Sequence, residues 1–446
     1  MKKNHQTMTT QNNNLDFTFA IQTLGCKVNT YESQVIASDL LALGFMEVSF
    51  NSVADIYIIN TCSVTNQADL KSRNMINRAL KLNKDAIIVV TGCYTTLGKK
   101  YLEANKKINI IVSNDQKLQV ADFIIQYLKD KKNININHNM LLNSKEFEHH
   151  HDLINSDQTR AFVKIQDGCN MMCSYCIIPF ARGKQRAKQH DVVIREIVNL
   201  VKNGFLEIVL TGVNTAGYLD GDIDFYKLLK LINEIDLKFK IRISSVEPFQ
   251  ISDEIIDLIT SNKDRFCQHW HLCLQSGSNK VLKDMNRNYT SNEFIALINK
   301  IKAKSPLSAF TTDVIVAYPT ENEDDFNKTI EVCKEVGFFK LHVFPYSKRS
   351  MTKASFLDDL HGDIKKQRVN TLIKLSDELG YKYLNNFLNK EIEVLFEHSN
   401  EKDVQIGHSD YYFKCLVKTN LDLFRQKRKV KVKGILNNEC ICELVD

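Results

Sequence analysis

The segment 167–179 carries three cysteines, Cys169, Cys173 and Cys176, in a Cys-x3-Cys-x2-Cys array. Three thiolates this close in sequence can bind three irons of an iron–sulfur cube and leave the fourth iron without a protein ligand. A small molecule can then bind that open iron directly, which a closed four-cysteine site does not allow. The array therefore predicts chemistry on a bound small molecule.

Two other interpretations of this array have less support. Structural zinc prefers four ligands, usually as two Cys-x2-Cys or Cys/His pairs, and the sequence offers one triplet with no such partner nearby. A disulfide between Cys173 and Cys176 would need an oxidising compartment. Residues 1–16 are polar, without the apolar core of a signal peptide, and no run is long enough to span a membrane. We therefore expect a disordered tail over 1–16, a cytoplasmic protein and no membrane partner. The twelve cysteines are then expected to be metal ligands or small buried residues.

A second set of three cysteines is spread over the first hundred residues. Cys26, Cys62 and Cys93 each follow an apolar, strand-like run, and a helical pattern follows each of them. Alternating strands and helices predict a doubly wound parallel sheet, and such sheets bind ligands at their carboxyl edge. We therefore expect the three thiols to meet at that edge and hold a second open cluster. The alternative is that they are small buried core residues, as free cysteines commonly are.

Hydrophobic periodicity outlines the elements that position these cysteines. The N-terminal strands are expected at 17–25, 54–61 and 86–92, with helices at 31–44, 67–83 and 97–106. Six further strands are expected at 161–166, 207–211, 240–245, 271–275, 312–317 and 341–345, with helices in the gaps. Six β/α units predict a partial (β/α)6 barrel whose active site lies at the carboxyl ends of its strands. Between the two parts, 129–157 reads as a linker rich in Asn, Lys and His. Its three histidines, 149–151, fit a solvated loop better than a metal site.

In the C-terminal residues the pattern changes to short runs of alternating apolar and polar residues, which predict strands at 391–396, 411–418, 428–434 and 439–445. About five such strands predict a small all-β barrel of a kind that binds RNA. Cys440 and Cys442 share one strand face and are predicted core residues. A basic strip and candidate stacking platforms are formed by Lys427, Arg428, Lys429, Lys431 and Lys433 and by Tyr411, Tyr412 and Phe413. A charged edge strand protected from aggregation is the alternative. The net charge of +6, from 59 basic and 53 acidic residues, permits a polyanionic partner without demanding one.

These pieces, in this order, resemble the methylthiotransferase family of radical S-adenosylmethionine (SAM) enzymes. The similarity rests on the stretches 23–33 (TLGCKVNTYES), 166–170 (QDGCN), 177–183 (IIPFARG), 244–248 (SSVEP), 274–278 (LQSGS) and 285–290 (MNRNYT). The stretch around Cys26 is most similar to the branch that modifies threonylcarbamoyladenosine at position 37 of tRNA. The resemblance implies an N-terminal methylthiotransferase domain over 17–128, a radical SAM barrel over 158–380 and a TRAM-like RNA-binding barrel over 381–446.

The resemblance also implies cofactors, partners and site residues. It implies two [4Fe-4S] clusters and SAM, which serves as both radical source and methyl donor for thiolation at C2 of the purine. The implied partners are a tRNA anticodon stem-loop, an electron donor such as flavodoxin or ferredoxin, and a sulfur donor. The expected SAM or substrate contacts are Tyr175, Gly212, Asn214, Glu247, Ser276 and Arg287. Lys184, Arg186 and Lys188 are expected either to hold an RNA phosphate or to form a solvated charged turn.

Departures from the family pattern are Ala317 and Thr320, where glycine is usual, and the segment 346–354, which lacks the usual Gly-Thr pair. Rival hypotheses keep the cysteines and change the substrate. One is methylthiolation of isopentenyladenosine in tRNA or of a ribosomal protein side chain. Another is a non-enzymatic iron–sulfur sensor that binds RNA and does not turn over SAM.

Overall fold

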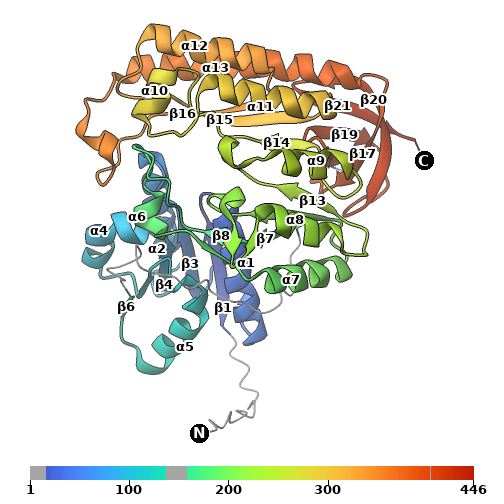
Figure 1. The fold of residues 1–446 in the computed structure, drawn as a ribbon. Helices are drawn as coiled ribbons and strands as arrows, with labels where there is room; N and C mark the ends of the chain where they lie inside the picture. Colours follow the sequence, from blue (N-terminus) through green and yellow to red (C-terminus); the bar gives the residue numbers. More distant parts are fainter. Residues whose placement is uncertain (1–16, 137–157, 402, 446) are drawn as a thin grey trace.

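Three folded parts follow one another along the chain in this computed structural model, which describes residues 17–136, 158–401 and 403–445 (Figure 1). The N-terminal part packs beside the central barrel, and the C-terminal strands pack at the other end of that barrel.

The N-terminal part is one six-stranded parallel sheet in the order β2-β1-β3-β4-β5-β6. Its strands are β1 (Thr18–Thr23), β2 (Met46–Glu47), β3 (Ile56–Thr61), β4 (Ile87–Gly92), β5 (Ile110–Val112) and β6 (Ile134–Ile136). Its helices are α1 (Lys27–Ala42), α2 (Asn66–Leu82), α3 (Tyr94–Leu97), α4 (Lys99–Ala104) and α5 (Val120–Asp130).

Helices cover both faces of this sheet. Ile58 of β3 packs in one core with side chains from α1 and α5, whereas the adjacent Ile59 packs in another with side chains from α2 and α4. Burial on both faces explains why the middle strands are apolar throughout. The predicted doubly wound sheet is confirmed. It runs past the boundary predicted at residue 128, because α5 and β6 use residues assigned to the linker. Residues 149–151 lie outside the described residues.

The central part has six parallel strands in two hydrogen-bonded groups, β13-β10-β7 and β14-β15-β16. A parallel bridge between Val246 and Leu272 joins the groups into one partial barrel, as the sequence predicts. The strands are β7 (Ala161–Lys164), β10 (Glu207–Thr211), β13 (Lys240–Ile243), β14 (His269–His271), β15 (Ala309–Val316) and β16 (Lys340–Pro345).

Helices surround the outside of the barrel and enclose one large apolar core. They are α7 (His190–Lys202), α8 (Phe225–Asn233), α9 (Asp253–Ser261), α11 (Ser291–Lys304) and α12 (Glu323–Val336). The long helix α13 (Gly362–Leu384) crosses the top of the view in Figure 1 and packs on β16. The boundary predicted at residue 380 therefore falls inside a helix, whose last residue, Leu384, belongs to the core of the next part.

The C-terminal part is a closed five-stranded barrel in the order β17-β18-β19-β21-β20. Its strands are β17 (Glu391–Phe396), β18 (Val404–Ser409), β19 (Lys414–Lys418), β20 (Lys427–Leu436) and β21 (Glu439–Leu444). Cys440 and Cys442 are buried in its core, as predicted. Across the described residues, every helix is too short or too polar to cross a membrane.

Candidate functional site

The three dispersed cysteines lie at the carboxyl ends of three neighbouring strands. Cys26 follows β1, Cys62 follows β3 and Cys93 follows β4. The strand order reverses between β1 and β3, and sheets of this kind bind ligands at that point. Cys62 and Cys93 are buried, and Cys26 is exposed as the N-cap residue of α1. Burial and the neighbouring Cys93 thiol raise the pKa of Cys62 to about 12.

Glycines let the backbone come close to these thiols. Gly25 has a φ of +100°, and a Cβ there would lie 2.8 Å from Cys62 Cβ and 2.9 Å from Cys62 Sγ. Gly92, at a φ of +96°, abuts the Thr61 backbone, and a Cβ there would lie 2.6 Å from Thr61 N. A larger residue at position 25 would therefore fill the space beside the Cys62 sulfur.

The second triad sits on a tight loop near the carboxyl end of β7, in the short hairpin of β8 (Gln166–Asp167) and β9 (Arg186–Ala187). The Cys169 amide donates to the Gly183 carbonyl at 3.1 Å, and the Ser174 amide donates to the Met285 carbonyl at 3.0 Å. Met172, inside the triad, has a φ of +50°, a conformation that a non-glycine residue adopts only where its surroundings enforce it. The loop is therefore held in one shape at both ends.

Neither triad has the geometry of a single-ion site. Within the described ranges, only His271, Cys273 and Asp313 place three ligand atoms within 4.8 Å of one another. A zinc ion holds each thiolate at about 2.3 Å and so requires closer sulfurs, whereas a cluster spreads its thiolates over different irons. All twelve cysteines are free thiols, which also removes the disulfide alternative for Cys173 and Cys176.

Three of the predicted SAM or substrate contacts surround Cys173. The Arg287 guanidinium donates to Cys173 Sγ at 3.2 Å and pairs with the Glu247 carboxylate. Burial raises the pKa of Glu247, although Arg287 acts against this shift. Tyr175, which lies in the cysteine loop, packs with Tyr318 and Tyr346.

Two more predicted contacts lie at the end of β10 and share Gln166 as a neighbour. The backbone amide of Asn214 donates to Gln166 Oε1 at 2.8 Å, and Gln166 Nε2 donates to the Gly168 carbonyl at 2.7 Å. A Cβ at Gly212 would lie 2.9 Å from Gln166 Oε1. The Asn214 Oδ1 atom is buried and has no hydrogen-bond partner, so a bound ligand could satisfy it.

The sixth predicted contact, Ser276, has hydrogen-bond partners of its own. Its fully buried hydroxyl accepts from the Ser278 amide at 3.2 Å and lies 3.4 Å from Thr329 Oγ1 on α12. These contacts shape the turn before α10 (Asn279–Asp284).

A buried charge network joins the two cysteine triads. Arg182, on α6 (Ile178–Arg182), donates to Glu32 Oε1 at 3.0 Å, to Glu32 Oε2 at 3.1 Å and to Asp167 Oδ1 at 3.0 Å. Glu32 lies on α1, six positions after Cys26, and Asp167 lies two positions before Cys169. One guanidinium therefore ties the element behind one triad to the loop of the other.

Cations outnumber carboxylates in this network. Lys117 and Lys164 also pair with Glu32, at 2.6 and 2.7 Å, and Arg186 pairs with Asp167 at 3.1 Å. Burial acts to raise the pKa of Glu32, but the surrounding cations outweigh it and hold that pKa well below its ordinary range. The two carboxylates face four cations, and the positive excess offsets the negative charge that thiolates bring to a cluster. The thiols, the close glycine and this charge balance fit two iron–sulfur clusters, and the unpartnered Asn214 oxygen fits a bound SAM.

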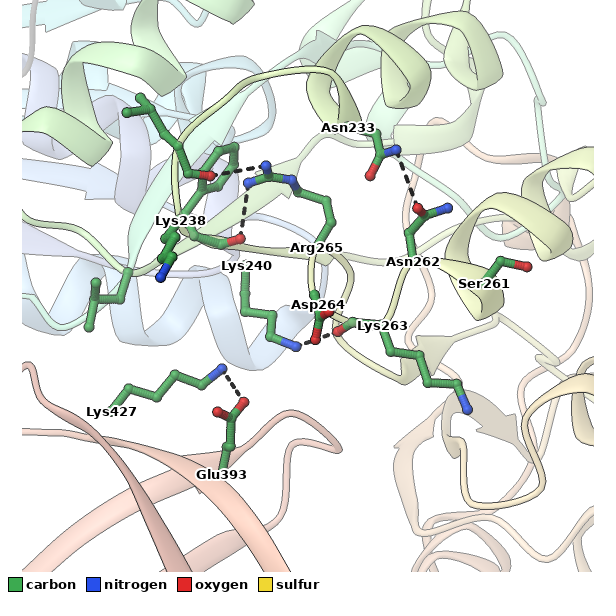
Figure 2. A pocket seen from close by; sticks show the side chains of 13 residues that line it. Asn233, Lys238, Lys240, Ser261, Asn262, Lys263, Asp264, Arg265, Glu393 and Lys427 are labelled. Carbon is green, nitrogen blue, oxygen red and sulfur yellow. Dashed lines mark hydrogen bonds and ion pairs between the residues drawn. The ribbon is translucent and has the colours of Figure 1, made fainter.

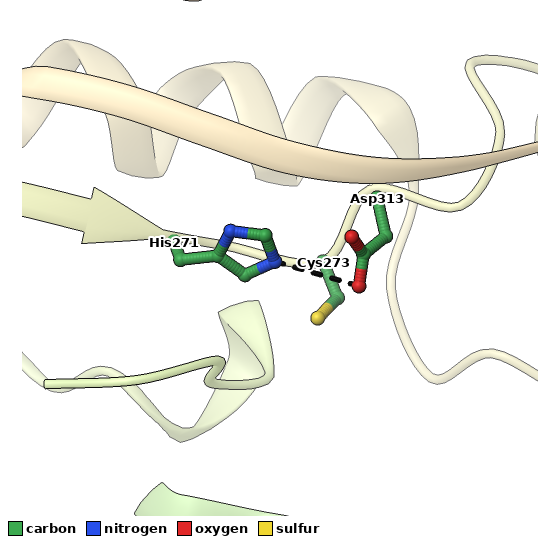
Figure 3. Close-up of side chains that lie close together, drawn as sticks. All are labelled: His271, Cys273 and Asp313. Atoms are coloured by element: carbon green, nitrogen blue, oxygen red, sulfur yellow. Dashed lines mark ion pairs between the residues drawn. The ribbon is translucent and has the colours of Figure 1, made fainter. Parts of the chain in front are cut away.

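A further polar group faces the barrel interior. Figure 3 shows the His271 ring directed at the Asp313 carboxylate, with the Cys273 thiol beside them. His271 Nε2 lies 3.4 Å from Asp313 Oδ2, and His271 Nδ1 lies 2.9 Å from Thr311 Oγ1. Burial acts to raise the pKa of Asp313, but the nearby His271 ring outweighs it and the pKa is lowered. Sequence reasoning missed this group, for which the available signal was a carboxylate inside a mostly buried strand.

The predicted phosphate contacts after the cysteine loop are mostly buried. Lys188 is 2% exposed and donates to Glu196 at 2.6 Å and to the Tyr31 hydroxyl at 3.0 Å. Arg186 is also buried, against Asp167. The prediction that these two side chains hold an RNA phosphate is therefore wrong, because both are used in internal contacts. Lys184 alone is exposed.

The basic strip predicted on the C-terminal barrel is partly exposed, and its binding to RNA stays a prediction. Arg428, Lys429 and Lys433 are exposed along β20. Phe413 is a core residue, so its prediction as a stacking platform is wrong. Tyr412 reaches toward the central barrel and stacks on His269, with ring centroids 4.8 Å apart.

A cleft between the central and C-terminal barrels lies away from the cysteine loop. Its volume is about 730 Å³, and Figure 2 shows Lys240 and Arg265 of the central barrel facing Lys427 and Glu393 of the C-terminal barrel. The Lys427 ammonium pairs with Glu393 at 2.6 Å. The cleft lies where β13 begins, whereas barrels of this type carry their chemistry at the carboxyl ends of their strands. We therefore assign the reaction to the cysteine side.

Comparison with known proteins agrees with this geometry. Residues 18–113 match the uncharacterized protein family UPF0004, and residues 163–333 match the radical SAM superfamily. The chain is 40% identical over 424 residues to a threonylcarbamoyladenosine tRNA methylthiotransferase of Bacillus subtilis, covering 93% of each chain. It is 33% identical over 395 residues to a tRNA-2-methylthio-N(6)-dimethylallyladenosine synthase of Clostridium novyi, covering 86% of each chain.

A solved structure supports the fold alone. A radical S-adenosylmethionine methyltransferase from Kitasatospora setae, with cobalamin and a [4Fe-4S] cluster bound, superposes with a TM-score of 0.56 at 12% identity. The match covers 76% of this chain and 77% of that one. By the identity and coverage of its relatives, the chain belongs to the radical SAM methylthiotransferase family and is most like the threonylcarbamoyladenosine tRNA branch.

Proposed function

We propose that this chain converts N6-threonylcarbamoyladenosine at position 37 of tRNA into its 2-methylthio derivative. The observation that carries the proposal is the pairing of two cysteine triads through Arg182. A single-cluster enzyme has no need of the second triad, and a redox sensor has no need of an open site beside a SAM-type loop. The relatives named for threonylcarbamoyladenosine indicate the substrate.

The six cysteines divide the cofactors between them. Cys169, Cys173 and Cys176 would hold the cluster that binds SAM, and Cys26, Cys62 and Cys93 would hold the auxiliary cluster. When bound, the clusters and SAM supply sulfur, a methyl group and one-electron chemistry, which a purine C2–H needs because acid–base catalysis offers it little.

The side chains around the cysteines position the reacting groups. Arg287 donates to Cys173 and is itself held by Glu247, so this pair orients the loop that presents the thiolates. Asn214 offers an unpartnered amide oxygen to a bound ammonium or hydroxyl group. Tyr175, Tyr318 and Tyr346 pack together on the loop and exclude water from that side.

The C-terminal barrel is proposed as a TRAM-like RNA-binding domain. Its exposed Arg428 and Lys429 on β20 suit the phosphates of an anticodon stem-loop. The three parts, predicted as 17–128, 158–380 and 381–446, then divide the work into sulfur supply, radical chemistry and RNA binding. An electron donor such as flavodoxin or ferredoxin, a sulfur donor and a cytoplasmic location complete the proposal.

Mass spectrometry of tRNA nucleosides tests the substrate. The 2-methylthio form of threonylcarbamoyladenosine should be present in cells that carry the gene and absent when it is deleted. Its persistence after deletion, together with loss of 2-methylthio-isopentenyladenosine or of a modified ribosomal protein, would reject the substrate assignment.

A further inference from the structure

Lys27 directly follows Cys26 and reaches a cavity at the meeting point of all three parts of the chain. The cavity has a volume of about 310 Å³. Its lining comes from Lys27 in the N-terminal part, from Arg160 and Arg242 in the central barrel, and from Glu397 and Tyr412 in the C-terminal barrel. One residue beside the auxiliary triad thus shares a space with the barrel and the proposed RNA-binding domain.

Lys27 is the cation of this cavity that lacks a carboxylate partner. Arg242 and Arg160 each donate to Glu207 Oε1 at 2.7 Å, and Arg160 also pairs with Glu397. No carboxylate of the described residues lies within 4.0 Å of the Lys27 ammonium, which instead stands 5.7 Å from the centroid of the Tyr412 ring. The two carboxylates pair with the two arginines, and Glu207 and Asp313 act on Lys27 only from beyond ion-pair distance, so its ammonium has no ion-pair partner among the described residues.

A cation without an ion-pair partner in a small cavity favours an anionic ligand. The proposed substrate carries such a group: the threonylcarbamoyl substituent on N6 ends in a free carboxylate, whereas a dimethylallyl substituent has no charge. In the purine ring, C2 and C6 both adjoin N1. A substrate whose C2 reaches the auxiliary triad therefore brings its N6 substituent close to the residues around Cys26.

We propose that Lys27 is a specificity-determining residue that binds the carboxylate of the threonylcarbamoyl group and so selects this substrate over uncharged N6-modified adenosines. The inference rests on the proposed function and adds the contact that distinguishes the substrate. Lys27 acts by binding and orienting the substrate, and no bond is made or broken at its ammonium.

The test compares two synthetic anticodon stem-loop RNAs, one with N6-threonylcarbamoyladenosine at position 37 and one with the methyl ester of the same group. Dissociation constants are measured by fluorescence anisotropy, and methylthiolation is followed in single turnovers. Wild-type enzyme should bind the ester about ten- to a hundredfold more weakly, because a charge-assisted contact is lost. Lys27→Gln should bind the acid and the ester equally, both near the wild-type value for the ester. Lys27→Arg should keep most of the preference.

Controls separate this contact from structural damage. Lys230→Gln, an exposed lysine on α8, should leave the preference unchanged. Iron content and 5′-deoxyadenosine formation should be unchanged in Lys27→Gln if its clusters are intact. Because the ester changes only the RNA, the wild-type comparison stands even if a variant folds poorly.

Two failures are distinguishable. If wild-type enzyme modifies the threonylcarbamoyl RNA but treats acid and ester alike, or if Lys27→Gln keeps the preference, the role of Lys27 is overturned and the proposed function stands. If wild-type enzyme modifies an isopentenyladenosine stem-loop and not the threonylcarbamoyl RNA, the proposed function fails and the role of Lys27 fails with it.

Discussion

Arg182 and Glu32 lie 150 positions apart in the chain, and the Arg182 guanidinium donates to both oxygens of the Glu32 carboxylate. The same guanidinium reaches Asp167, just before the cysteine loop of the barrel. A buried side chain that belongs to neither triad therefore helps to fix their relative position, together with the Lys164–Glu32 pair.

Removing Arg182 should weaken both the fold and the site. Arg182→Met leaves Glu32 and Asp167 short of a partner in a buried setting, so the free energy of unfolding should fall by about 3–5 kcal/mol. Urea titration measures this change. Arg195→Met removes an exposed i,i+4 pair with Asp191 and should cost less than about 1 kcal/mol. Equal effects of the two substitutions would show that burial of the network contributes nothing.

A methyl group at position 25 should displace the auxiliary cluster. Gly25→Ala places a Cβ 2.9 Å from Cys62 Sγ, so reconstituted protein should hold about four irons per chain instead of about eight. Gly44→Ala is the matched control, because Gly44 also has a positive φ, +89°, but a Cβ there meets nothing within 4 Å. If both variants lose iron alike, backbone strain and not contact with the thiol is the cause.

Loss of one of the three dispersed cysteines should abolish methylthiolation and leave SAM cleavage intact. Cys62→Ala should abolish methylthiolated product in a tRNA assay while 5′-deoxyadenosine still forms, because the other triad is untouched. Cys415→Ala truncates a thiol in the C-terminal core and should retain both activities. Normal methylthiolation by Cys62→Ala would remove the auxiliary cluster from the proposal.

Glycine at position 317 should stabilise the protein. Ala317, where the family resemblance leads one to expect glycine, has a φ of +56° and is fully buried. Ala317→Gly relieves that strained conformation, and we expect a gain of roughly 0.5–1 kcal/mol in thermal or urea unfolding. Ala309 is the first residue of β15, the strand that ends just before Ala317, and it has no positive φ. Ala309→Gly should instead lose about 1 kcal/mol of stability.

Stability should fall at acid pH through Glu207. Burial acts to raise the pKa of this carboxyl, but Arg242 and Arg160 outweigh it, and the pKa is lowered from 4.5 to about 2. A folded-state pKa below the unfolded value stabilises the fold above pH 4.5, and this contribution of about 3 kcal/mol disappears as the pH falls to about 2.

Urea titrations at about pH 6 and about pH 3 check this dependence. Glu207→Gln should be less stable than wild type at the higher pH, because Arg242 and Arg160 lose their shared carboxylate. It should also lose less stability between the two values. An unchanged pH dependence in Glu207→Gln would mean that other carboxyls carry the acid transition.

The architecture was predictable from hydrophobic patterns where elements are long and apolar. The strand expected at 54–61 appears as β3 at 56–61, and all six of its residues are buried between two helix layers. By contrast, β18 was not located, because Gly407 and His408 interrupt its apolar alternation. β6 was read as linker because it has only three residues and lies in a stretch rich in Asn and Lys.

The cysteine positions followed from the rule that ligands gather at the carboxyl edge of a parallel sheet. The charged groups between the triads did not, because burial of a charged side chain depends on partners that are distant in sequence. Lys188 reads as a surface lysine in its own segment, yet Tyr31 and Glu196 enclose it. Arg182 and Glu32 both occur in the family-like stretches, but only the fold brings them together.

The two triads differ in when they can exist. Cys169, Cys173 and Cys176 share one short loop, so a nascent chain can offer all three thiols to iron before distant contacts form. Cys26, Cys62 and Cys93 come from three β/α units and converge only after the sheet has assembled. The dispersed site therefore exists only in the folded N-terminal sheet, so a protein whose sheet misfolds keeps only the loop cysteines together for iron.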